Sequence, residues 1–284
     1  MAADQWLSAS KKATRWQVDE VDAGDLVQAS APSIFHIGRL DLSFAPKTWT
    51  FAAERRAEID AYFEAIRREK PAVWNGRILL LHHQVVEQGV LRGQYLETDY
   101  ASFAAWCDWG RPAAGVRDCF SAAAMRSADG AFLLAAMGPH TFNAGRINFP
   151  CGAPDPNDVV ADKVDLDLSV RRELKEETGL DITEFDAAAG WYMVVDGPLI
   201  ALIKLLRSSE NAIALRERIL AHLAREEKPE LADVRIVRGQ SDFDRAMPDF
   251  VRAFLTARFA AEKLQRRDAR NCPLVDSNQE LSEP

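Results

Sequence analysis

The segment Arg172–Leu180 holds the residues of this chain that are best suited to chemistry. It reads Arg-Glu-Leu-Lys-Glu-Glu-Thr-Gly-Leu and contains Glu173, Glu176 and Glu177. On a helix these positions are i, i+3 and i+4, so the three carboxylates share one face. Carboxylates this close repel one another, and partial burial strengthens the repulsion. A hard divalent cation such as Mg²⁺ or Mn²⁺ binds carboxylate oxygens and relieves the conflict.

A cation held by glutamates suits the cleavage of a phosphoanhydride. It neutralises phosphate charge and makes a bound water a stronger nucleophile. A glutamate-rich helix face is more commonly plain solvated surface. The surrounding sequence favours the functional interpretation, because the helix follows a hairpin, a short strand and a Gly turn and ends in Gly179-Leu180.

Hydrophobic periodicity predicts the elements that position the glutamates. A helix is expected over Leu166–Thr178, and Gly179 is its C-terminal stop. Its apolar stripe lies beside the glutamates and consists of Leu166, Val170 and Leu174. Further helices are expected over about 51–69, 99–110, 211–227 and 249–264, and strands over about 34–44, 77–87, 90–98, 119–126, 131–137, 146–149, 190–195, 199–206 and 234–237.

The same segment resembles a known motif. Arg172–Leu180 matches the C-terminal half of the Nudix box, G-x5-E-x7-R-E-U-x-E-E-x-G-U, in which U is apolar. The preceding stretches FSAAAMRSADGAFLLAAM and INFPCG are similar to the hairpin and the strand-plus-turn that lead into the box. The resemblance covers roughly residues 115–262. It implies an α/β protein whose second half is a Nudix-type α/β/α sandwich with a mixed sheet between helices.

The resemblance also implies roles for individual residues. Glu176 and Glu177 would be ligands of Mg²⁺ or Mn²⁺, and Glu173 would be a metal ligand or help to activate the water. Arg172 would hold a glutamate in place through a charge-assisted hydrogen bond. Gly152 would let the backbone approach the metal, with its carbonyl as a ligand. Glu173 and Arg172 are therefore the expected catalytic residues.

The first half of the box departs from the pattern. Counted from Gly152, the position expected to hold Glu carries Asp158, and thirteen residues rather than seven then precede Arg172. Counted back from Arg172, the same position carries Val164. About six residues therefore look inserted, and the role of Asp158 stays open. Cys151 stands where the family usually has its first Gly.

Substrate contacts are expected from the loop before the box. His140 and Arg146 lie in or beside this loop and could touch substrate phosphate. Asp158 is added to them as a third candidate. The stretch Asn143–Pro150 partly resembles a coenzyme A diphosphatase motif, although Asn143 stands at the position of the expected His.

The chain is expected to have two folded parts. Residues 34–114 form a small accessory α/β module, and residues 115–262 form the Nudix domain. An extension precedes them over 1–33, and a disordered tail follows over 263–284. The stretches IDAYFEAIRREKPAVWNGRILLL and YLETDYASFAAW faintly resemble the N-terminal module of Nudix enzymes that hydrolyse UDP-sugars, and an unrelated α/β module fits nearly as well.

Composition narrows the class of protein. Apolar residues make up 48% of the 284 residues and charged residues 27%, which is typical of a soluble globular protein. The net charge of −8 argues against general nucleic-acid binding. Four cysteines without a CxxC pair favour reduced thiols in a cytoplasm. No signal peptide or membrane span is expected, and the accessory module could serve as a homodimer surface.

The predicted function is hydrolysis of a phosphoanhydride in a nucleoside diphosphate linked to another moiety, with Mg²⁺ or Mn²⁺ as cofactor. Nucleotide sugars such as UDP-glucose, ADP-ribose and coenzyme A all carry that core. One alternative is a Nudix-like domain that binds a nucleotide with weak or no turnover, which the altered half of the box favours. A second alternative is isoprenoid isomerisation, which needs a catalytic Cys and for which Cys151 is the candidate.

Overall fold

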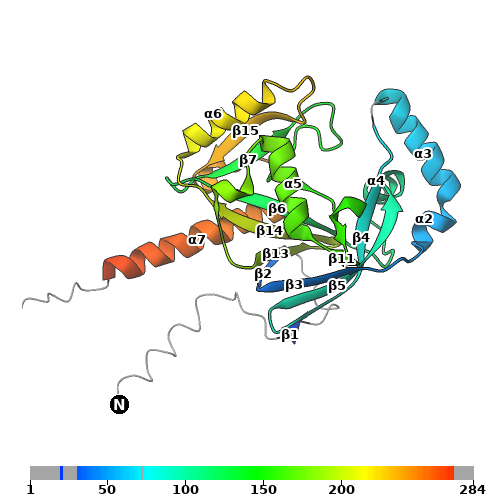
Figure 1. The fold of residues 1–284 in the computed structure, drawn as a ribbon, viewed down its shortest axis with the longest axis horizontal. Helices are drawn as coiled ribbons and strands as arrows, with labels where there is room; N and C mark the ends of the chain where they lie inside the picture. Colours follow the sequence, from blue (N-terminus) through cyan, green and yellow to red (C-terminus); the bar gives the residue numbers. More distant parts are fainter. Residues whose placement is uncertain (1–19, 22–30, 72, 272–284) are drawn as a thin grey trace, which may run out of the picture.

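The computed structural model of the chain describes residues 20–21, 31–71 and 73–271. Two mixed β-sheets lie side by side within this part of the chain, and helices flank both of them (Figure 1). The α/β fold class predicted from the sequence is confirmed. No helix in the described ranges is long and apolar enough to cross a membrane.

The larger sheet carries the segment that was predicted to be catalytic. Its nine strands follow the order β15-β7-β6-β14-β13-β2, with three short strands paired to its members. Its centre is the parallel pair β6 and β14, and the other pairs are antiparallel. The strands are β2 (Ser33–Ile37), β6 (Asp118–Arg126), β7 (Phe132–Met137), β8 (Ile147–Asn148), β9 (Cys151–Gly152), β12 (Asp186–Ala187), β13 (Trp191–Asp196), β14 (Leu199–Arg207) and β15 (Leu231–Val237).

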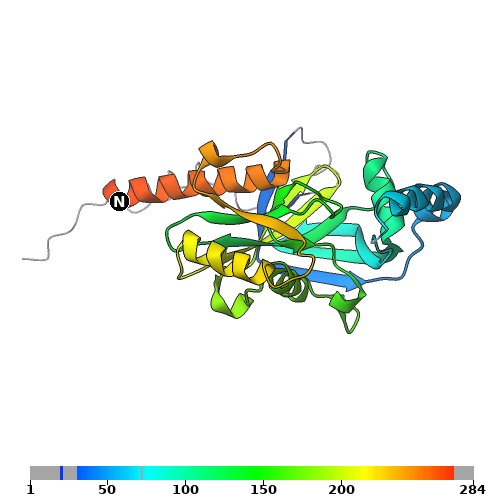
Figure 2. The ribbon, with the colours of Figure 1, turned by 90° about the horizontal axis from the view of Figure 1, so that it is seen from above.

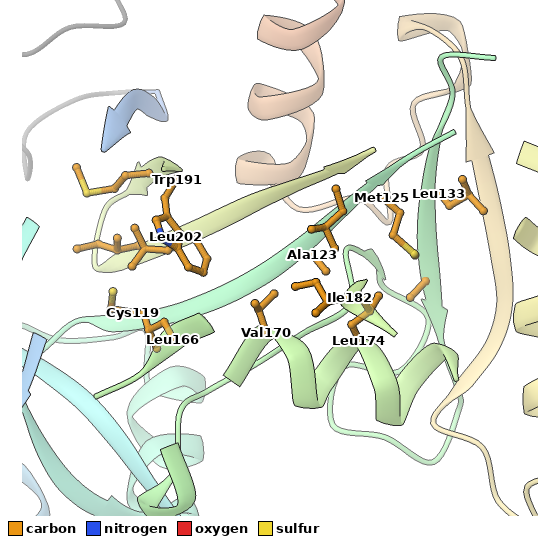
Figure 3. Close-up of a cluster of buried hydrophobic side chains, with 14 of the residues drawn as sticks. Cys119, Ala123, Met125, Leu133, Leu166, Val170, Leu174, Ile182, Trp191 and Leu202 are labelled. Carbon is orange, nitrogen blue, oxygen red and sulfur yellow. The ribbon is translucent and has the colours of Figure 1, made fainter. Parts of the chain in front are cut away.

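Helices bury both faces of this sheet. Helices α5 (Leu166–Thr178) and α6 (Ala212–Leu223) cover one face, and α7 (Asp249–Asn271) covers the other (Figure 2). Strand β6 therefore has no solvated side, since its alternate residues enter two different cores. On the α5 side, the stripe predicted from the sequence packs against Cys119, Ala123 and Met125 (Figure 3).

The smaller sheet is formed mainly by the N-terminal half. Its strand order is β1-β4-β5-β3-β11-β10. The strands are β1 (Glu20–Val21), β3 (Arg39–Phe44), β4 (Arg77–Glu87), β5 (Val90–Asp99), β10 (Val159–Val160) and β11 (Lys163–Val164). Helices α2 (Thr50–Glu54), α3 (Arg56–Glu69) and α4 (Tyr100–Asp108) pack beside it, and the 3-10 turns are η3 (Pro156–Asp158), η4 (Ile182–Glu184) and η5 (Gln240–Asp242).

Strands cross between the two halves of the chain in both directions. The predicted strand over 34–44 is two strands, because the chain turns at Gly38 and enters the second sheet. In the opposite direction, the stretch 153–164 contains the hairpin β10–β11, which pairs with β3 at Ser43. The domain division near residue 114 remains a prediction, and both sheets contain strands from each side of it.

Two further expectations need correction. The helix expected over 51–69 is broken at Arg55, which separates α2 from α3. The last helix does not end at residue 264 but continues to Asn271, into the predicted disordered tail. No Gly or Pro interrupts 265–271, so nothing in that stretch stops helix propagation. Residues 272–284 and most of the predicted extension 1–33 lie outside the described residues.

The ends of α5 are fixed by local chemistry. At its start the Asp165 side chain accepts a hydrogen bond from the backbone N–H of Leu168 at 3.0 Å. At its end Gly179 adopts the left-handed conformation, with φ of 71°. A Cβ atom at Gly179 would lie 2.5 Å from Cγ of His222 on α6. The position therefore requires glycine both for its backbone angle and for the approach of α6.

Gly179→Ala should destabilise the protein more than Gly145→Ala. Gly145 has a similar φ of 74° but open space around its Cα, so alanine there costs only the left-handed conformation, about 1 kcal/mol. At Gly179 the imidazole of His222 must also move, which adds about 1 kcal/mol or more. Urea unfolding of both variants measures the difference. Equal losses would show that the His222 contact restricts nothing.

Candidate active site

Helix α5 directs two of its three glutamates into a cavity. Glu177 is 7% exposed, and the side chain of Glu173, one turn earlier, is 13% exposed. The side chain of Glu176 is 63% exposed, and its Oε2 lies 3.6 Å from Nη1 of Arg172. The predicted face of three glutamates is therefore a buried pair with one outlying carboxylate.

The cavity has a volume of about 960 Å³ and receives groups from distant parts of the chain. Besides the glutamate pair it is lined by Cys151 and Gly152 of β9, the loop 139–143, Trp74, Lys70, Lys228 and Glu230. Sequence reasoning missed both lysines and Glu230, since nothing in their local patterns distinguishes them from ordinary surface residues. The fold brings them together because the loop after α6 and the segment after α3 both reach this cavity.

Gly152 and Glu173 are in close contact. A Cβ atom at Gly152 would lie 2.2 Å from Oε1 and 2.7 Å from Oε2 of Glu173. Any side chain at this position would displace the carboxylate. The resemblance implied that Gly152 lets the backbone approach the metal, and this role stays a prediction; the structure places Gly152 against Glu173.

Burial perturbs both carboxyl groups. It raises the pKa of Glu173 to about 7, a shift that Arg172 opposes and Glu176 adds to. It also raises the pKa of Glu177 well above its usual range, and the nearby charges of Glu173 and Glu230 act in the same direction. Oε2 of Glu177 is buried and has no hydrogen-bond partner in the described part of the chain. The pair is thus short of positive charge.

Arg172 fixes one of these glutamates. Its Nη1 donates to Oε1 of Glu173 at 2.7 Å, and its Nη2 donates to Oδ2 of Asp158 at 3.0 Å. Asp158 is fully buried and also accepts a hydrogen bond from the backbone N–H of Asp155 at 3.0 Å. The expectation that Asp158 contacts substrate needs correction, because it has no exposed surface. It anchors Arg172. Asp158 is also the residue at the Glu position of the motif when the count starts from Gly152.

The two other predicted substrate contacts lie in different cavities. His140 lines the glutamate cavity. Arg146 is exposed and lines a second cavity of about 480 Å³. The two cavities are neighbours and share the wall formed by Tyr100, Phe142, Asn143, Cys151 and Gly152. A ligand in contact with Glu173 could therefore extend towards Arg146.

Aromatic side chains line the second cavity, and two of them, Tyr100 and Phe142, also line the glutamate cavity. Tyr100 and Phe103 come from α4, and Phe142, which is 38% exposed, comes from the loop before β8. The rings of Tyr100 and Phe142 meet edge to face at a centroid distance of 5.8 Å. Asp118 lies deeper in the wall, where burial raises its pKa to about 6 against the effect of Arg111. The sequence places these residues in two predicted domains and gives no signal that they meet.

The residues present partly fit a divalent cation. Glu173 and Glu177 offer hard oxygen ligands, and the unpartnered Oε2 of Glu177 calls for a positive charge. The predicted set of three ligands is not assembled around the cavity, because Glu176 pairs with Arg172 at 3.6 Å and does not line the cavity. Among the described residues, no group of three or more His, Cys, Asp or Glu side chains is placed to hold a metal ion. The fit is limited to the buried pair.

The cysteine near the site is partly buried. Burial raises the pKa of Cys151 well above its usual range, and Glu177 and Glu173 raise it further. Its sulfur accepts a hydrogen bond from Nδ2 of Asn148 at 3.3 Å. The thiol is therefore kept protonated, which does not favour the isomerase alternative.

Comparison with known proteins gives matches only among solved structures. No protein-family model matches the chain, and no curated protein matches it. The Nudix hydrolase RenU from M. smegmatis is 17% identical, with 56% of this chain and 88% of that chain covered and a TM-score of 0.30. The MutT protein from Methanosarcina mazei Go1 is 20% identical, with 52% and 95% covered and a TM-score of 0.33.

A third match is the Nudix domain of Shewanella oneidensis NrtR, in a structure with ADP-ribose. It is 17% identical, with 58% of this chain and 97% of that chain covered and a TM-score of 0.31. The solved structures that resemble this chain are therefore Nudix proteins. At these identities and TM-scores the likeness carries no argument about activity, and the chemistry must be argued from the residues of this chain.

Proposed function

We propose that the protein hydrolyses a phosphoanhydride in a nucleoside diphosphate linked to another moiety, with Mg²⁺ or Mn²⁺ as cofactor. The observation that carries this proposal is the buried pair Glu173 and Glu177 beside Gly152, in a cavity that also contains two lysines. Two adjacent buried carboxylates repel each other, and either a bound cation or protonation of one of them relieves the repulsion. The same cation would bind a diphosphate.

Both residues of the pair would hold the cation, and Glu173 would also act as the base. Glu177 and Glu173 would hold the cation, which neutralises phosphate charge and lowers the pKa of bound water. Because Arg172 occupies Oε1 of Glu173, Oε2 is left to accept a proton from the attacking water. The water oxygen forms a new bond to phosphorus, the bridging P–O bond breaks, and the departing phosphate leaves with the electron pair.

Basic side chains are placed to bind the rest of the diphosphate. Lys70, Lys228 and His140 line the glutamate cavity together with the acidic pair. Lys70 is held by its Nζ, which donates to the carbonyl oxygen of Thr141 at 3.2 Å. Such groups offset the charge of the phosphate oxygens that the cation does not reach. They also orient the substrate along the cavity towards Gly152.

The second cavity suits the nucleoside. Tyr100, Phe103 and Phe142 give it aromatic walls, and stacking on such rings is the common way in which proteins bind a nucleobase. Arg146 lies in the same cavity and supplies a positive charge near the diphosphate. The nucleoside would then contact α4 of the N-terminal half, while cleavage takes place at α5.

One observation favours a second candidate function. Glu176 lies outside the cavity, so the described site offers two carboxylates where the resemblance implies three. A site of this kind could bind a nucleotide with little turnover. The variants below separate the two functions, because a binding site without turnover gives no product in the unmodified protein.

Glu177→Gln and Glu173→Gln should each lower kcat/KM by about 100-fold or more, since each removes a ligand charge worth several kcal/mol. Glu176→Gln is the matched control from the same helix turn and should lower it by only a few fold, because Glu176 is exposed. Assays with Mg²⁺ or Mn²⁺ over a panel of nucleoside diphosphate derivatives, with products read by mass, measure this order. A loss in Glu176→Gln as large as in Glu177→Gln would contradict the assignment.

Phe142→Ala should raise KM about 5-fold or more while kcat changes little, because a stacking surface contributes to binding and not to bond cleavage. Phe142→Tyr keeps the ring and should behave like the unmodified protein. Steady-state kinetics on the best substrate of the panel tests both. An unchanged KM in Phe142→Ala would contradict the proposal that the nucleobase binds in this cavity.

A further inference from the structure

A third cavity lies away from the glutamates, where the two sheets meet. It has a volume of about 460 Å³ and lies between β4, the loop over 110–117 and the turn that joins β13 to β14. Its ionisable lining residues are His82, Arg111 and Arg117. None of the described residues that line it is Asp or Glu, in contrast to the other two cavities. In a chain of net charge −8, such a concentration of positive groups is unexpected.

Arg117 is the central group of this cavity. It is partly buried, and burial lowers its pKa. Its Nη1 donates to the carbonyl oxygen of Gly197 at 2.8 Å. In the described part of the chain it forms no ion pair within 4.0 Å, and the nearest acid in sequence, Asp118, is paired with Arg111 at 3.5 Å. A partly buried guanidinium without a counter-charge is costly, so an anion that pairs with Arg117 would be stabilised here.

Two other groups, Arg111 and His82, lie beside Arg117 in the lining of this cavity. Nε of Arg111 is buried without a hydrogen-bond partner in the described residues. Burial lowers the pKa of His82, and the positive charge of Lys47 acts in the same direction. Because Asp118 is the counter-charge of Arg111, Arg117 is the unpaired cation among the described lining residues, and His82 can remain neutral and act as a hydrogen-bond partner.

The remaining walls are apolar. Pro112, Ala113, Ala114 and Pro198 line the cavity with exposed or partly exposed apolar surface, and Leu81, Trp106 and Val116 lie buried behind it. Trp106 is fully buried in its own core, and its Nε1–H donates to the carbonyl oxygen of Pro112 at 2.9 Å on the cavity wall. A ligand that fills this space needs an apolar body as well as a negative group.

We propose that this cavity is a binding site for a small organic anion, whose carboxylate or phosphate pairs with Arg117 and whose apolar body lies against Pro112 and Pro198. The site is separate from the proposed catalytic pair, since its lining residues include none of the glutamate cavity. It shares only Arg111 with the proposed nucleoside cavity. The proposal does not depend on the proposed function.

The indole N–H resonance of Trp106 reports on this site directly, because its acceptor Pro112 forms part of the cavity wall. It is assigned in a ¹⁵N correlation spectrum with Trp106→Phe. Phenyl phosphate and benzoate are titrated separately into the full chain without added divalent metal, with benzyl alcohol as a neutral match. We expect a saturable shift of the resonance with one or both anions and none with benzyl alcohol. The anion that gives the shift identifies the class.

Arg117→Gln should weaken binding of that anion about 10-fold or more, and Arg117→Lys should retain most of it, because lysine keeps the charge. Glu177→Gln should leave the shift unchanged, which excludes binding at the glutamate cavity as its source. The folded state of each variant is checked by the dispersion of the same spectrum. Absence of a saturable shift, an equal shift with benzyl alcohol, or equal affinity in a folded Arg117→Gln variant would overturn the proposal.

Discussion

Burial of two carboxylates one helical turn apart is the constraint on which the candidate site depends. Glu173 and Glu177 lie beside the apolar stripe of α5, so packing of that stripe on the large sheet carries them out of water. Repulsion between them must be offset within the protein or by a bound ion. Within this pair Arg172 offsets the repulsion at Glu173 and not at Glu177. The guanidinium of Arg172 is also shared with the carboxylate of Asp158. The site is therefore built with an electrostatic deficit at Glu177.

Local sequence signals predicted the helix that carries the site, including both of its ends. Leu166–Thr178 matches the expected range, and Gly179 is in the left-handed conformation that a C-terminal glycine implies. The orientation of Glu176 could not be predicted in the same way. Helical spacing defines a face about 100° wide but does not say where on that face burial ends. The position of the sheet and of β9 decides that two of the three glutamates are enclosed.

Long-range pairing explains what the sequence could not predict. The hairpin β10–β11 has strands of two residues and a turn at Ala161-Asp162, both with positive φ. It lacks the Asn-Gly or Asp-Gly signal that marks such turns, so the stretch reads as loop. The switch of sheets at Gly38 and the meeting of Tyr100 with Phe142 likewise depend on contacts between residues far apart in sequence. Resemblance to a motif locates the acidic helix but says nothing of these contacts.

The hairpin β10–β11 has a consequence for how this protein could have been assembled. It lies between Gly152 and α5 in the chain yet pairs with β3, while the carbonyl oxygen of Pro154 accepts a hydrogen bond from Leu79 of β4. The stretch between Gly152 and α5, which separates the two halves of the motif, thus forms an edge of the N-terminal sheet, and it also contains the anchor Asp158. Replacement of the N-terminal half by another module would remove the strand with which the hairpin pairs. It would also leave Asp158, which accepts a hydrogen bond from Arg172, in a less restrained segment. Shuffling of the two halves between proteins is therefore disfavoured by the fold itself.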